Sequence, residues 1–160
     1  MKFFGGKDKI IYPELSFKIC GLCYETHNKL GRYLNEKQYA DYLEELFKNN
    51  GIKYEREKPL LPLFNGERLA RNIPDFVIED VIILDLKAKF MVTKQDYFQM
   101  QRYLNSANKK LGLIVNFRRK FLHPKRVLNM NFRQSNSASV ANPTKDTGII
   151  SKLRRYMNHS

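Results

Sequence analysis

The sequence has 160 residues, of which 42% are hydrophobic and 12% aromatic, and these values exclude an intrinsically disordered chain. Two cysteines are too few for a disulfide-stabilised fold. No run approaches the ~20 apolar residues of a membrane span, and the N-terminus lacks the apolar segment of a signal peptide, so we predict a cytoplasmic protein that does not enter a membrane.

The formal charge of +13 is unevenly distributed along the chain. The segment from Ala107 to Ser160 contains 12 Lys or Arg and a single acidic residue, Asp146, so its net charge is +11 and only +2 remains for the first 106 residues. This asymmetry favours a polyanionic partner, with nucleic acid ahead of an anionic membrane surface. A soluble basic tail without a dedicated ligand is the alternative.

Helical spacing of apolar residues predicts a first helix over Pro13–Leu30, which begins at a proline and ends at Gly31. A second helix is expected from the N-cap Asn35 to Asn49. Glu36 lies on the same inward stripe as Tyr39, so its carboxylate either complements the helix dipole or serves a site.

Cys20, Cys23 and His27 have the spacing of a partial metal site within the first helix. No second cysteine pair and no fourth ligand accompany them, so we interpret the two cysteines as small buried thiols rather than zinc ligands. We expect His27 to be a structural histidine.

Further along the chain, turn residues alternate with short apolar runs and predict a set of strands. Asn65-Gly66 predicts a hairpin between Leu60–Phe64 and Arg68–Ile73, and Glu79-Asp80 predicts a tight turn. The other expected strands are Ile52–Arg56, Asp75–Ile78, Val81–Lys87, Leu111–Phe117 and the short edge strand Arg126–Leu128, with a helix over Thr93–Ala107. Together they predict an α/β fold whose strands are mostly antiparallel.

The stretch from Pro74 to Lys87 contains the residues with the most chemical content. An acid, Asp75, follows the proline, and an Asp85-x-Lys87 pattern interrupts an apolar strand. Side chains alternate along a strand, so Asp85 and Lys87 share a face with Val81 and Ile83. Paired carboxylates there suit a divalent metal ion, and a lysine suits an anion or an attacking water. The alternative is an ordinary ion pair on the wet face of a strand.

Beyond Met130 the apolar pattern fades. Gln134–Thr147 is rich in Ser, Asn and Thr and is expected to be disordered or weakly ordered, whereas Ile149–Met157 is expected to form a short basic helix. We therefore predict an N-terminal lead-in (1–12), one domain (13–130) and a basic tail (131–160).

In this order the motifs resemble those of the GxxExxY proteins, a branch of the PD-(D/E)xK nuclease superfamily, over about residues 14–128. The segment Gly21–Gly31 resembles the family's first helix, and Leu111–Phe117 resembles its strand that ends in Asn-Phe. The naming motif retains Glu36 and Tyr39, although Tyr33 replaces its glycine. The superfamily signature is matched by Asp75 and Asp85-Leu86-Lys87, with Asp85 where this family more often has Glu, and the family's helix motif by Gln99-x3-Tyr103-Leu104.

The resemblance implies a restriction-endonuclease-like core, a central mixed sheet flanked by helices, and a Mg²⁺-dependent nuclease that also accepts Mn²⁺. DNA is a more probable substrate than RNA. The implied metal ligands are Glu36, Asp75, Asp85 and the carbonyl of Leu86, while Lys87 orients the attacking water and Gln99 positions it. Tyr39, Tyr103 and His27 support the site. Seven basic residues are expected to contact phosphates: Lys109, Lys110, Arg118, Arg119, Lys120, Lys125 and Arg126.

Two other interpretations fit the same residues. The fold could carry a non-catalytic nucleic-acid-binding or adaptor protein, since Tyr33 and Asp85 depart from the family pattern. A protein-interaction module whose tail only adds solubility is the third interpretation. The sequence predicts no oligomeric state.

Overall fold

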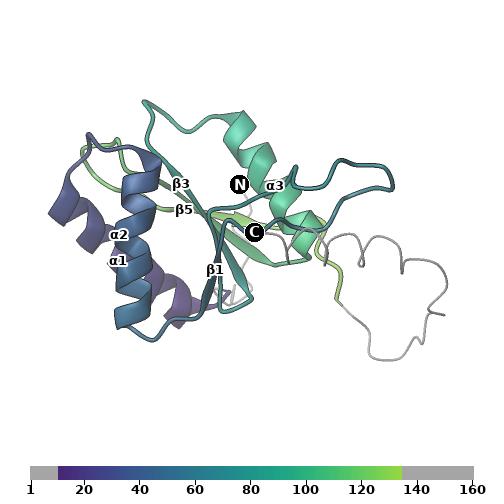
Figure 1. The fold of residues 1–160 in the computed structure, drawn as a ribbon, viewed down its shortest axis with the longest axis horizontal. Coiled ribbons are helices and arrows are strands. Elements are labelled where there is room, and N and C mark those ends of the chain that lie inside the picture. Colours follow the sequence, from purple (N-terminus) through teal and green to yellow (C-terminus); the bar gives the residue numbers. More distant parts are fainter. Residues whose placement is uncertain (1–10, 135–160) are drawn as a thin grey trace, which may run out of the picture.

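A mixed β-sheet forms the centre of the protein in the computed structural model, which describes residues 11–134 (Figure 1). Its five strands lie side by side in sequence order, and β3 and β4 pair in parallel while all other neighbours pair antiparallel. The strands are β1 (Tyr54–Arg56), β2 (Phe76–Ile78), β3 (Ile82–Lys87), β4 (Leu111–Asn116) and β5 (Lys125–Leu128). The helices are α1 (Pro13–Leu30), α2 (Glu36–Asn49) and α3 (Lys94–Ala107). The predicted α/β fold with a mixed central sheet is confirmed.

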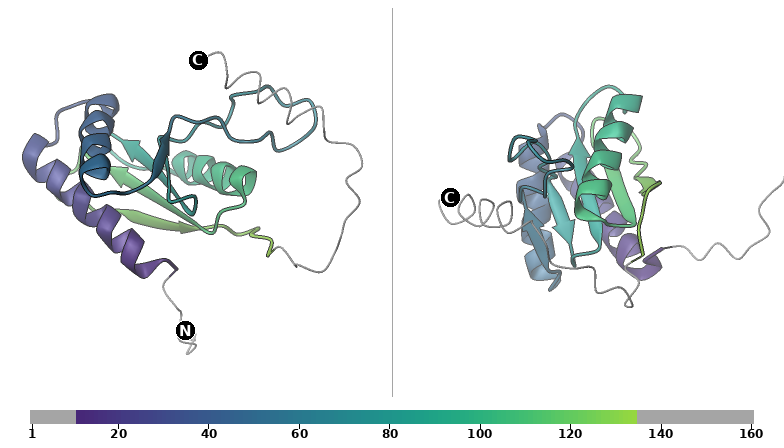
Figure 2. Two further views of the ribbon diagram at one scale, coloured as in Figure 1. Left: turned by 60° about the horizontal axis from the view of Figure 1, so that its bottom comes forward. Right: turned by 90° about the vertical axis from the view of Figure 1, so that its right-hand side faces the viewer.

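Alternation along β3 separates the molecule into two layers on either side of the sheet. Ile82, Leu84 and Leu86 belong to the core shared with α1 and α2, whereas Ile83 packs with α3 on the opposite face. The left-hand view of Figure 2 shows α1 and α2 together and apart from α3, and the core residues place the two groups on opposite faces of the sheet. Asp85 and Lys87, which alternate with these leucines, therefore lie on the α3 face.

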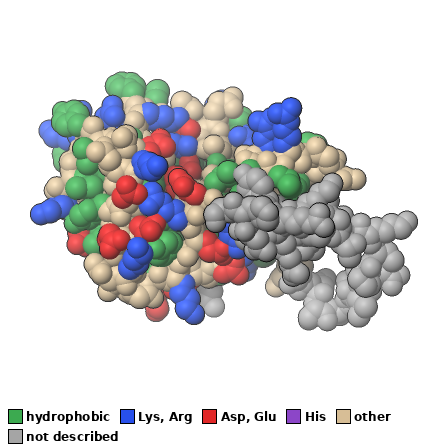
Figure 3. Space-filling view, in the orientation of Figure 1, with side chains coloured by type: hydrophobic (Ala, Val, Ile, Leu, Met, Phe, Trp, Pro, Cys, Tyr) green, Lys and Arg blue, Asp and Glu red, His purple; other side chains and the backbone are tan. Residues whose placement is uncertain are grey.

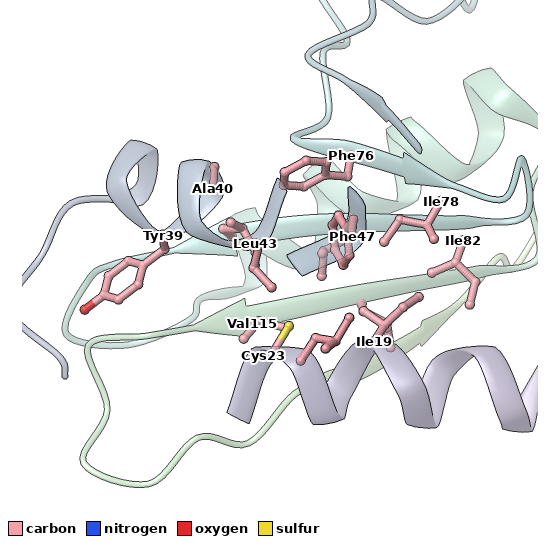
Figure 4. Packing of buried hydrophobic residues seen from close by; sticks show 14 of the residues in the cluster. Ile19, Cys23, Tyr39, Ala40, Leu43, Phe47, Phe76, Ile78, Ile82 and Val115 are labelled. Carbon is pink, nitrogen blue, oxygen red and sulfur yellow. The ribbon is translucent and has the colours of Figure 1, made fainter. Parts of the chain in front are cut away.

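The larger core fills the space between the sheet and the first two helices (Figure 4). Leu43 and Phe47 of α2 point toward the strands, and Phe47 meets Phe76 of β2 edge-on with ring centroids 5.2 Å apart. Burial of such side chains contributes about 1.5–3 kcal/mol each relative to exposure. This layer fixes β2 and β3, and it contains no ion pair among its buried residues.

The helix ends follow the sequence signals. Asn35 caps α2, because its side chain accepts a hydrogen bond from Gln38 N (3.0 Å) and its own N–H donates to the Gln38 side chain (3.0 Å). Helix α1 ends at Gly31, whose positive φ of 75° suits glycine and whose N–H donates to His27 O (2.9 Å). The two caps together fix the short turn that leads into Glu36.

The predicted hairpin around Asn65-Gly66 is wrong in its strands. The turn itself forms, since Glu67 N donates to Phe64 O (3.2 Å) and Gly66 has a φ of 96°. Neither Leu60–Phe64 nor Arg68–Ile73 is a strand.

The reason lies in the prolines of this segment. Pro59 and Pro62 have no N–H to donate to a ladder, and the backbone bond from Leu60 N to Asn72 O (2.8 Å) is the one the structure forms between the two arms. The apolar side chains near the tip stay exposed, so no buried face stabilises a strand. The segment is a long loop that leads to Asp75.

Two smaller corrections concern β3. Glu79 and Asp80 form the predicted turn, both with positive φ, and Val81 N donates to Ile78 O (3.0 Å). Val81 thus belongs to the turn and precedes the strand. Its side chain packs against the α1–α2 core, whereas the prediction placed it on the face of Asp85. Regular alternation begins at Ile82.

The expectations for the C-terminal tail, including the helix at Ile149–Met157, lie outside the described residues. Within residues 11–134, no helix combines the length and apolarity needed to cross a bilayer.

Candidate active site

Asp85 and Lys87 form a buried ion pair on the α3 face of β3. Lys87 Nζ lies 2.8 Å from Asp85 Oδ2 and donates a hydrogen bond to Gln99 Oε1, also at 2.8 Å. Burial lowers the pKa of Lys87, but the charge and hydrogen bond of Asp85, together with the charges of Asp96 and Glu36, raise it, and the net shift is upward. Lys87 is thus an ammonium group held between α3 and β3, and Gln99 is one of the groups that orient it.

Asp75 reaches the same place from the neighbouring strand. Phe76 pairs with Leu84, and continuing this antiparallel register places Asp75 opposite Asp85 on the same face. Asp75 Oδ2 accepts a hydrogen bond from the backbone N–H of Leu86 (2.6 Å). Burial and the adjacent Asp85 carboxylate raise the pKa of Asp75 to about 7, because two neighbouring carboxylates resist double ionisation.

Tyr103 of α3 holds the segment that carries Asp75. Its buried hydroxyl donates to Ile73 O (3.2 Å), two residues before the aspartate. Burial, and then the charges of Asp85 and Asp75, raise the pKa of Tyr103, so the hydroxyl keeps its proton and remains a donor. The supporting role of Tyr103 stays a prediction.

Glu36, the first residue of α2, lies near the end of β3 where Lys87 lies, without touching the other acids. It is exposed, and its charge contributes the smallest of the named effects that raise the pKa values of Asp75 and Lys87. Glu36 also lines an open surface hollow together with Tyr33, Ala88 and Arg118. Ala88 directly follows Lys87 in the chain, but its side chain packs against the α1–α2 core, so the hollow lies on the other face of the sheet from the ion pair, at the same end of β3.

Tyr39 fixes the turn from which Glu36 starts. The tyrosine is fully buried, donates to Gly31 O (2.7 Å) and accepts from Leu34 N (3.3 Å). Its ring stacks on Phe117 at 4.3 Å, which links α2 to the end of β4. Tyr39 thus positions the glutamate and does not contact the buried acids itself.

The acid groups fit a divalent cation only in part. Among residues 11–134, no three or more His, Cys, Asp or Glu side chains are arranged to hold a metal ion. The oxygens that do converge are the carboxylates of Asp75 and Asp85, and the carbonyl of Leu86 lies in the strand next to Asp85. Mg²⁺ is commonly bound by one or two carboxylates and retains several waters, so this set of hard oxygen donors suits it. A cation would also offset the repulsion between the two acids.

Sequence reasoning missed Asp96, a buried acid in the first turn of α3. Asp96 Oδ2 accepts a hydrogen bond from Thr93 N (2.7 Å) and pairs with Lys89, while Oδ1 lies 3.8 Å from Lys87 Nζ. Burial raises the pKa of Asp96, but the hydrogen bonds from Lys89 and Thr93 lower it more. The spacing of Thr93 and Asp96 predicts a helix cap, but no local signal places the carboxylate beside Lys87.

Asn116 at the end of β4 has a larger structural role than its sequence match suggested. Its amide donates to Lys89 O (2.7 Å) and accepts from Lys89 N (3.1 Å), and Phe117 N donates to Lys87 O (2.8 Å). The chain that leaves β3 is thereby tied to β4. These bonds hold the backbone on either side of Lys87.

His27 and the two cysteines lie with α1, on the opposite face of the sheet from Asp85. His27 Nε2 makes a hydrogen bond with Arg119 O (2.8 Å) and its ring packs near Phe117. Cys23 is fully buried in the core and Cys20 is half-buried, and burial raises the pKa of both thiols. The structure thus gives His27 a bonding partner in the chain that follows β4.

The seven predicted phosphate-binding residues do not gather at one place. Lys109 and Lys110 precede β4 at the end remote from Lys87, where Lys109 Nζ pairs with Asp80 (3.0 Å) and Lys110 lies over the Phe132 ring. Lys110 lies six positions before Asn116, roughly 20 Å along the strand at the usual rise.

Lys125 and Arg126 belong to the edge strand β5. The Arg126 guanidinium is engaged by Ser16 Oγ (2.8 Å) and Ile11 O (2.8 Å), which places it on the α1 face. By contrast, Arg118, Arg119 and Lys120 directly follow β4, which runs parallel to β3 and ends beside Lys87. His27 of α1 bonds Arg119 O and the Arg118 side chain donates to Arg32 O, so this basic segment lies toward α1 and α2, at the end of the sheet where Lys87 lies.

Comparison with known proteins gives a family match. The family model described as the PD-(D/E)XK nuclease superfamily matches residues 13–127. Among solved structures, one titled "Crystal structure of SSO0001" is similar over 88% of this chain and 73% of its own, with 15% identity and a TM-score of 0.44, a likeness too weak to support an argument. No curated protein matches the sequence.

Proposed function

Because the chain belongs to the PD-(D/E)XK nuclease superfamily, we propose that it is a divalent-metal-dependent nuclease whose active centre contains Asp75, Asp85 and Lys87. Nucleases of this superfamily generally use divalent metal ions and act on nucleic acid. One observation carries the proposal: Asp75 and the Asp85–Lys87 pair come from separate segments of the chain and meet on the α3 face of β3. The GxxExxY branch stays a prediction.

We assign the metal-binding role to the carboxylates of Asp75 and Asp85 and to the carbonyl of Leu86. These oxygens fit Mg²⁺, and Mn²⁺ is the expected substitute. A bound divalent ion would lower the pKa of a water and polarise the scissile phosphate. Glu36 is too exposed and too distant to bind the same ion in the geometry described, so its proposed role is contact through a water.

Lys87 is the group we expect to act on the reacting atoms. Its ammonium group orients the attacking water and stabilises the negative charge that develops on the phosphate. Gln99, hydrogen-bonded to Lys87 Nζ, holds the ammonium in place. Water oxygen bonds to phosphorus, a bridging P–O bond breaks, and the products are a phosphate monoester and an alcohol.

The substrate is nucleic acid, and we propose DNA ahead of RNA. Arg118, Arg119 and Lys120, which follow β4 at the end of the sheet where Lys87 lies, are the residues that we expect to contact the backbone phosphates. Such contacts position a strand without reading its sequence. Lys109 and Lys110, at the other end of β4, would bind at most a distant part of a long substrate.

A cleavage panel tests the proposal. Supercoiled plasmid and labelled single- and double-stranded oligonucleotides of DNA and RNA are incubated with Mg²⁺, Mn²⁺ or EDTA. We expect divalent-dependent cleavage that falls about 100- to 1,000-fold in Asp85→Asn and in Lys87→Met, the range seen when one charge-stabilising group is removed. Glu45→Gln and Lys48→Met, which remove an exposed acid and an exposed lysine of α2, serve as matched controls.

The outcomes separate the three interpretations of the sequence. Cleavage that survives both site variants would reject the assigned centre. Tight, salt-sensitive binding without cleavage would favour a non-catalytic nucleic-acid-binding protein. Negligible binding at low salt would favour a protein-interaction module.

A further inference from the structure

Three aromatic side chains protrude into solvent around the candidate active site. The ring of Tyr33 is 80% exposed, Phe90 is 90% exposed and Phe121 is 68% exposed. They come from three connections, α1–α2, β3–α3 and β4–β5, which lie at the same end of the molecule, upper left in Figure 1. We call these three residues the aromatic rim.

The rim borders a surface hollow at the same end of the sheet as the site. Tyr33 lines the surface hollow that also contains Glu36, Ala88 and Arg118. The side chain of Arg118 donates to Arg32 O (3.0 Å), which ties the β4–β5 connection to the backbone next to Tyr33. Phe90 lies two residues after Ala88, at most about 7 Å along the chain.

Phe121 follows Arg118 by three residues, so its Cα lies within about 11 Å of the Arg118 Cα. Each rim residue is therefore a short distance along the chain from a residue that lines the hollow, or lines it itself.

Positive charge surrounds these rings. The Arg32 guanidinium lies 5.4 Å from the Tyr33 ring centroid, and Lys120 Nζ lies 5.5 Å from that of Phe121. Arg118, Arg119 and Lys37 add three more cations, and Glu36 is the acid among the residues that line the hollow. Within residues 11–134 none of these five cations forms an ion pair. Figure 3 shows hydrophobic and basic side chains interleaved along this end of the surface.

Exposed rings among unpaired cations match the chemistry of a nucleic-acid strand with unpaired bases. The cations suit phosphates, and each aromatic face suits the face of a base. In an intact duplex the base faces are covered by their neighbours, so a protruding ring has nothing on which to stack except at an end or an unpaired site. The surplus of positive charge also distinguishes this surface from a typical protein interface, whose core is depleted of charge.

We propose that the aromatic rim binds unpaired nucleotides, with Tyr33 stacking on a base, and that the preferred substrate is a single strand or a strand with unpaired nucleotides at the cleavage point. The preference for cleavage rests on the proposed nuclease function. The stacking itself does not, because it is a binding property that can be measured without catalysis.

The sequence has no tryptophan, so one introduced at the rim is a clean fluorescent reporter. The full-length protein would carry Tyr33→Trp together with Asp75→Asn, in EDTA, to prevent cleavage. The probes are a 15-nucleotide oligothymidylate, a 15-nucleotide oligouridylate and a blunt DNA hairpin of 15 base pairs. The matched control is Phe17→Trp, because Phe17 is 83% exposed near the opposite end of α1, roughly 20 Å along the helix.

We expect the single strands to quench the emission of the Tyr33→Trp variant and the hairpin to quench it several-fold less at equal concentration. The Phe17→Trp control should not be quenched. In anisotropy titrations with labelled oligothymidylate, Tyr33→Ala should weaken binding about 5- to 150-fold, the equivalent of ~1–3 kcal/mol per stacked base, and Tyr33→Phe should restore it. Because Tyr33 is exposed, an unchanged melting temperature is expected for each variant.

Equal affinity of Tyr33→Ala and wild type for the single strands, or a preference for the hairpin, would overturn the proposal. Quenching by single strands in a protein that fails to cleave any substrate would keep the rim and reject the nuclease. Cleavage of duplex DNA without any Tyr33 effect would keep the nuclease and reject the rim. Binding of neither probe would overturn the proposal in favour of a protein partner.

Discussion

The six residues of β3 alternate between two faces of the sheet, and the two faces have different roles. Ile82, Leu84 and Leu86 enter the core with α1 and α2, whereas Asp85 and Lys87, between and beyond the leucines, meet Asp75 and Gln99 under α3. The first face gains stability from apolar burial, and the second holds desolvated charges that water would have solvated better. The comparison teaches that one strand can give stability on one side and chemistry on the other, because alternation keeps the two separate.

We expect the largest effect when the charged face of β3 is converted into an apolar one. In Asp85→Leu/Lys87→Met we expect cleavage to fall at least about 1,000-fold, equivalent to ~4 kcal/mol of transition-state stabilisation. Thermal unfolding should show stability equal to wild type or higher, because replacing a buried ion pair by apolar residues is often neutral or stabilising. A large loss of stability would show that the pair supports the fold rather than the reaction.

A substitution on the apolar face of β3 should instead lower stability and leave cleavage unchanged. Leu84→Ala should lower the free energy of unfolding by about 2–5 kcal/mol, since it removes a fully buried side chain. Urea denaturation measures the loss, and cleavage per folded molecule should stay near the wild-type value. Leu128→Ala, on the exposed edge strand, is the matched control and should change stability by at most about 0.5 kcal/mol.

The ionisation of Asp75 makes the stability of the protein depend on pH. Its folded-state pKa of about 7 lies above its ordinary value of 3.8, so between these values the folded protein keeps a proton that the unfolded chain has lost. Stability without metal therefore falls as the pH rises from 3.8 to 7.

Asp75→Asn removes this ionisation but keeps an acceptor for Leu86 N. In EDTA at pH 8 we expect a melting temperature higher by about 2–4 °C, corresponding to ~1 kcal/mol in a domain of this size, and a smaller gain at pH 5. A gain that does not depend on pH would argue against the proposed burial of the Asp75 charge.

The smallest expected effect concerns the turn before Glu36. Tyr39→Phe keeps the stack on Phe117 but removes the hydroxyl that bonds Gly31 O and Leu34 N, so unfolding should become easier by about 0.5–1.5 kcal/mol. If Glu36 serves the site, the same change should reduce cleavage severalfold at saturating substrate. Tyr24→Phe, an exposed tyrosine of α1, is the control and should leave both quantities unchanged.

Much of the fold could be predicted because local signals agreed with the tertiary structure. Proline, glycine and Asn35 marked the helix ends, and the Glu79-Asp80 turn set the register that places Asp75 opposite Asp85. The prediction of strands on either side of Asn65-Gly66 was wrong. The turn signal does not show whether the residues that flank the turn have a buried face or free N–H groups, and strands need both.

The environment of the charged residues could not be predicted in the same way. The contact between Asp96 and Lys87 depends on how α3 packs against the sheet, which no spacing along the chain encodes. The basic residues likewise look like one group in sequence, yet the length of β4 separates Lys109 and Lys110 from Arg118. Which cations reach the site is decided by the parallel pairing of β3 and β4, a non-local property.

Calorimetric titration of the metal-free protein with Mn²⁺ at pH 8 tests the central claim most directly. We expect one saturable site that requires both Asp75 and Asp85. Asp75→Asn and Asp85→Asn should each weaken binding at least about 10-fold, which corresponds to the loss of one charge-assisted ligand bond of ~1.4 kcal/mol or more. The control Glu45→Gln should bind Mn²⁺ like wild type. Binding that is absent in the wild-type protein, or equally strong in all four proteins, would contradict the assignment of Asp75 and Asp85 as the metal centre.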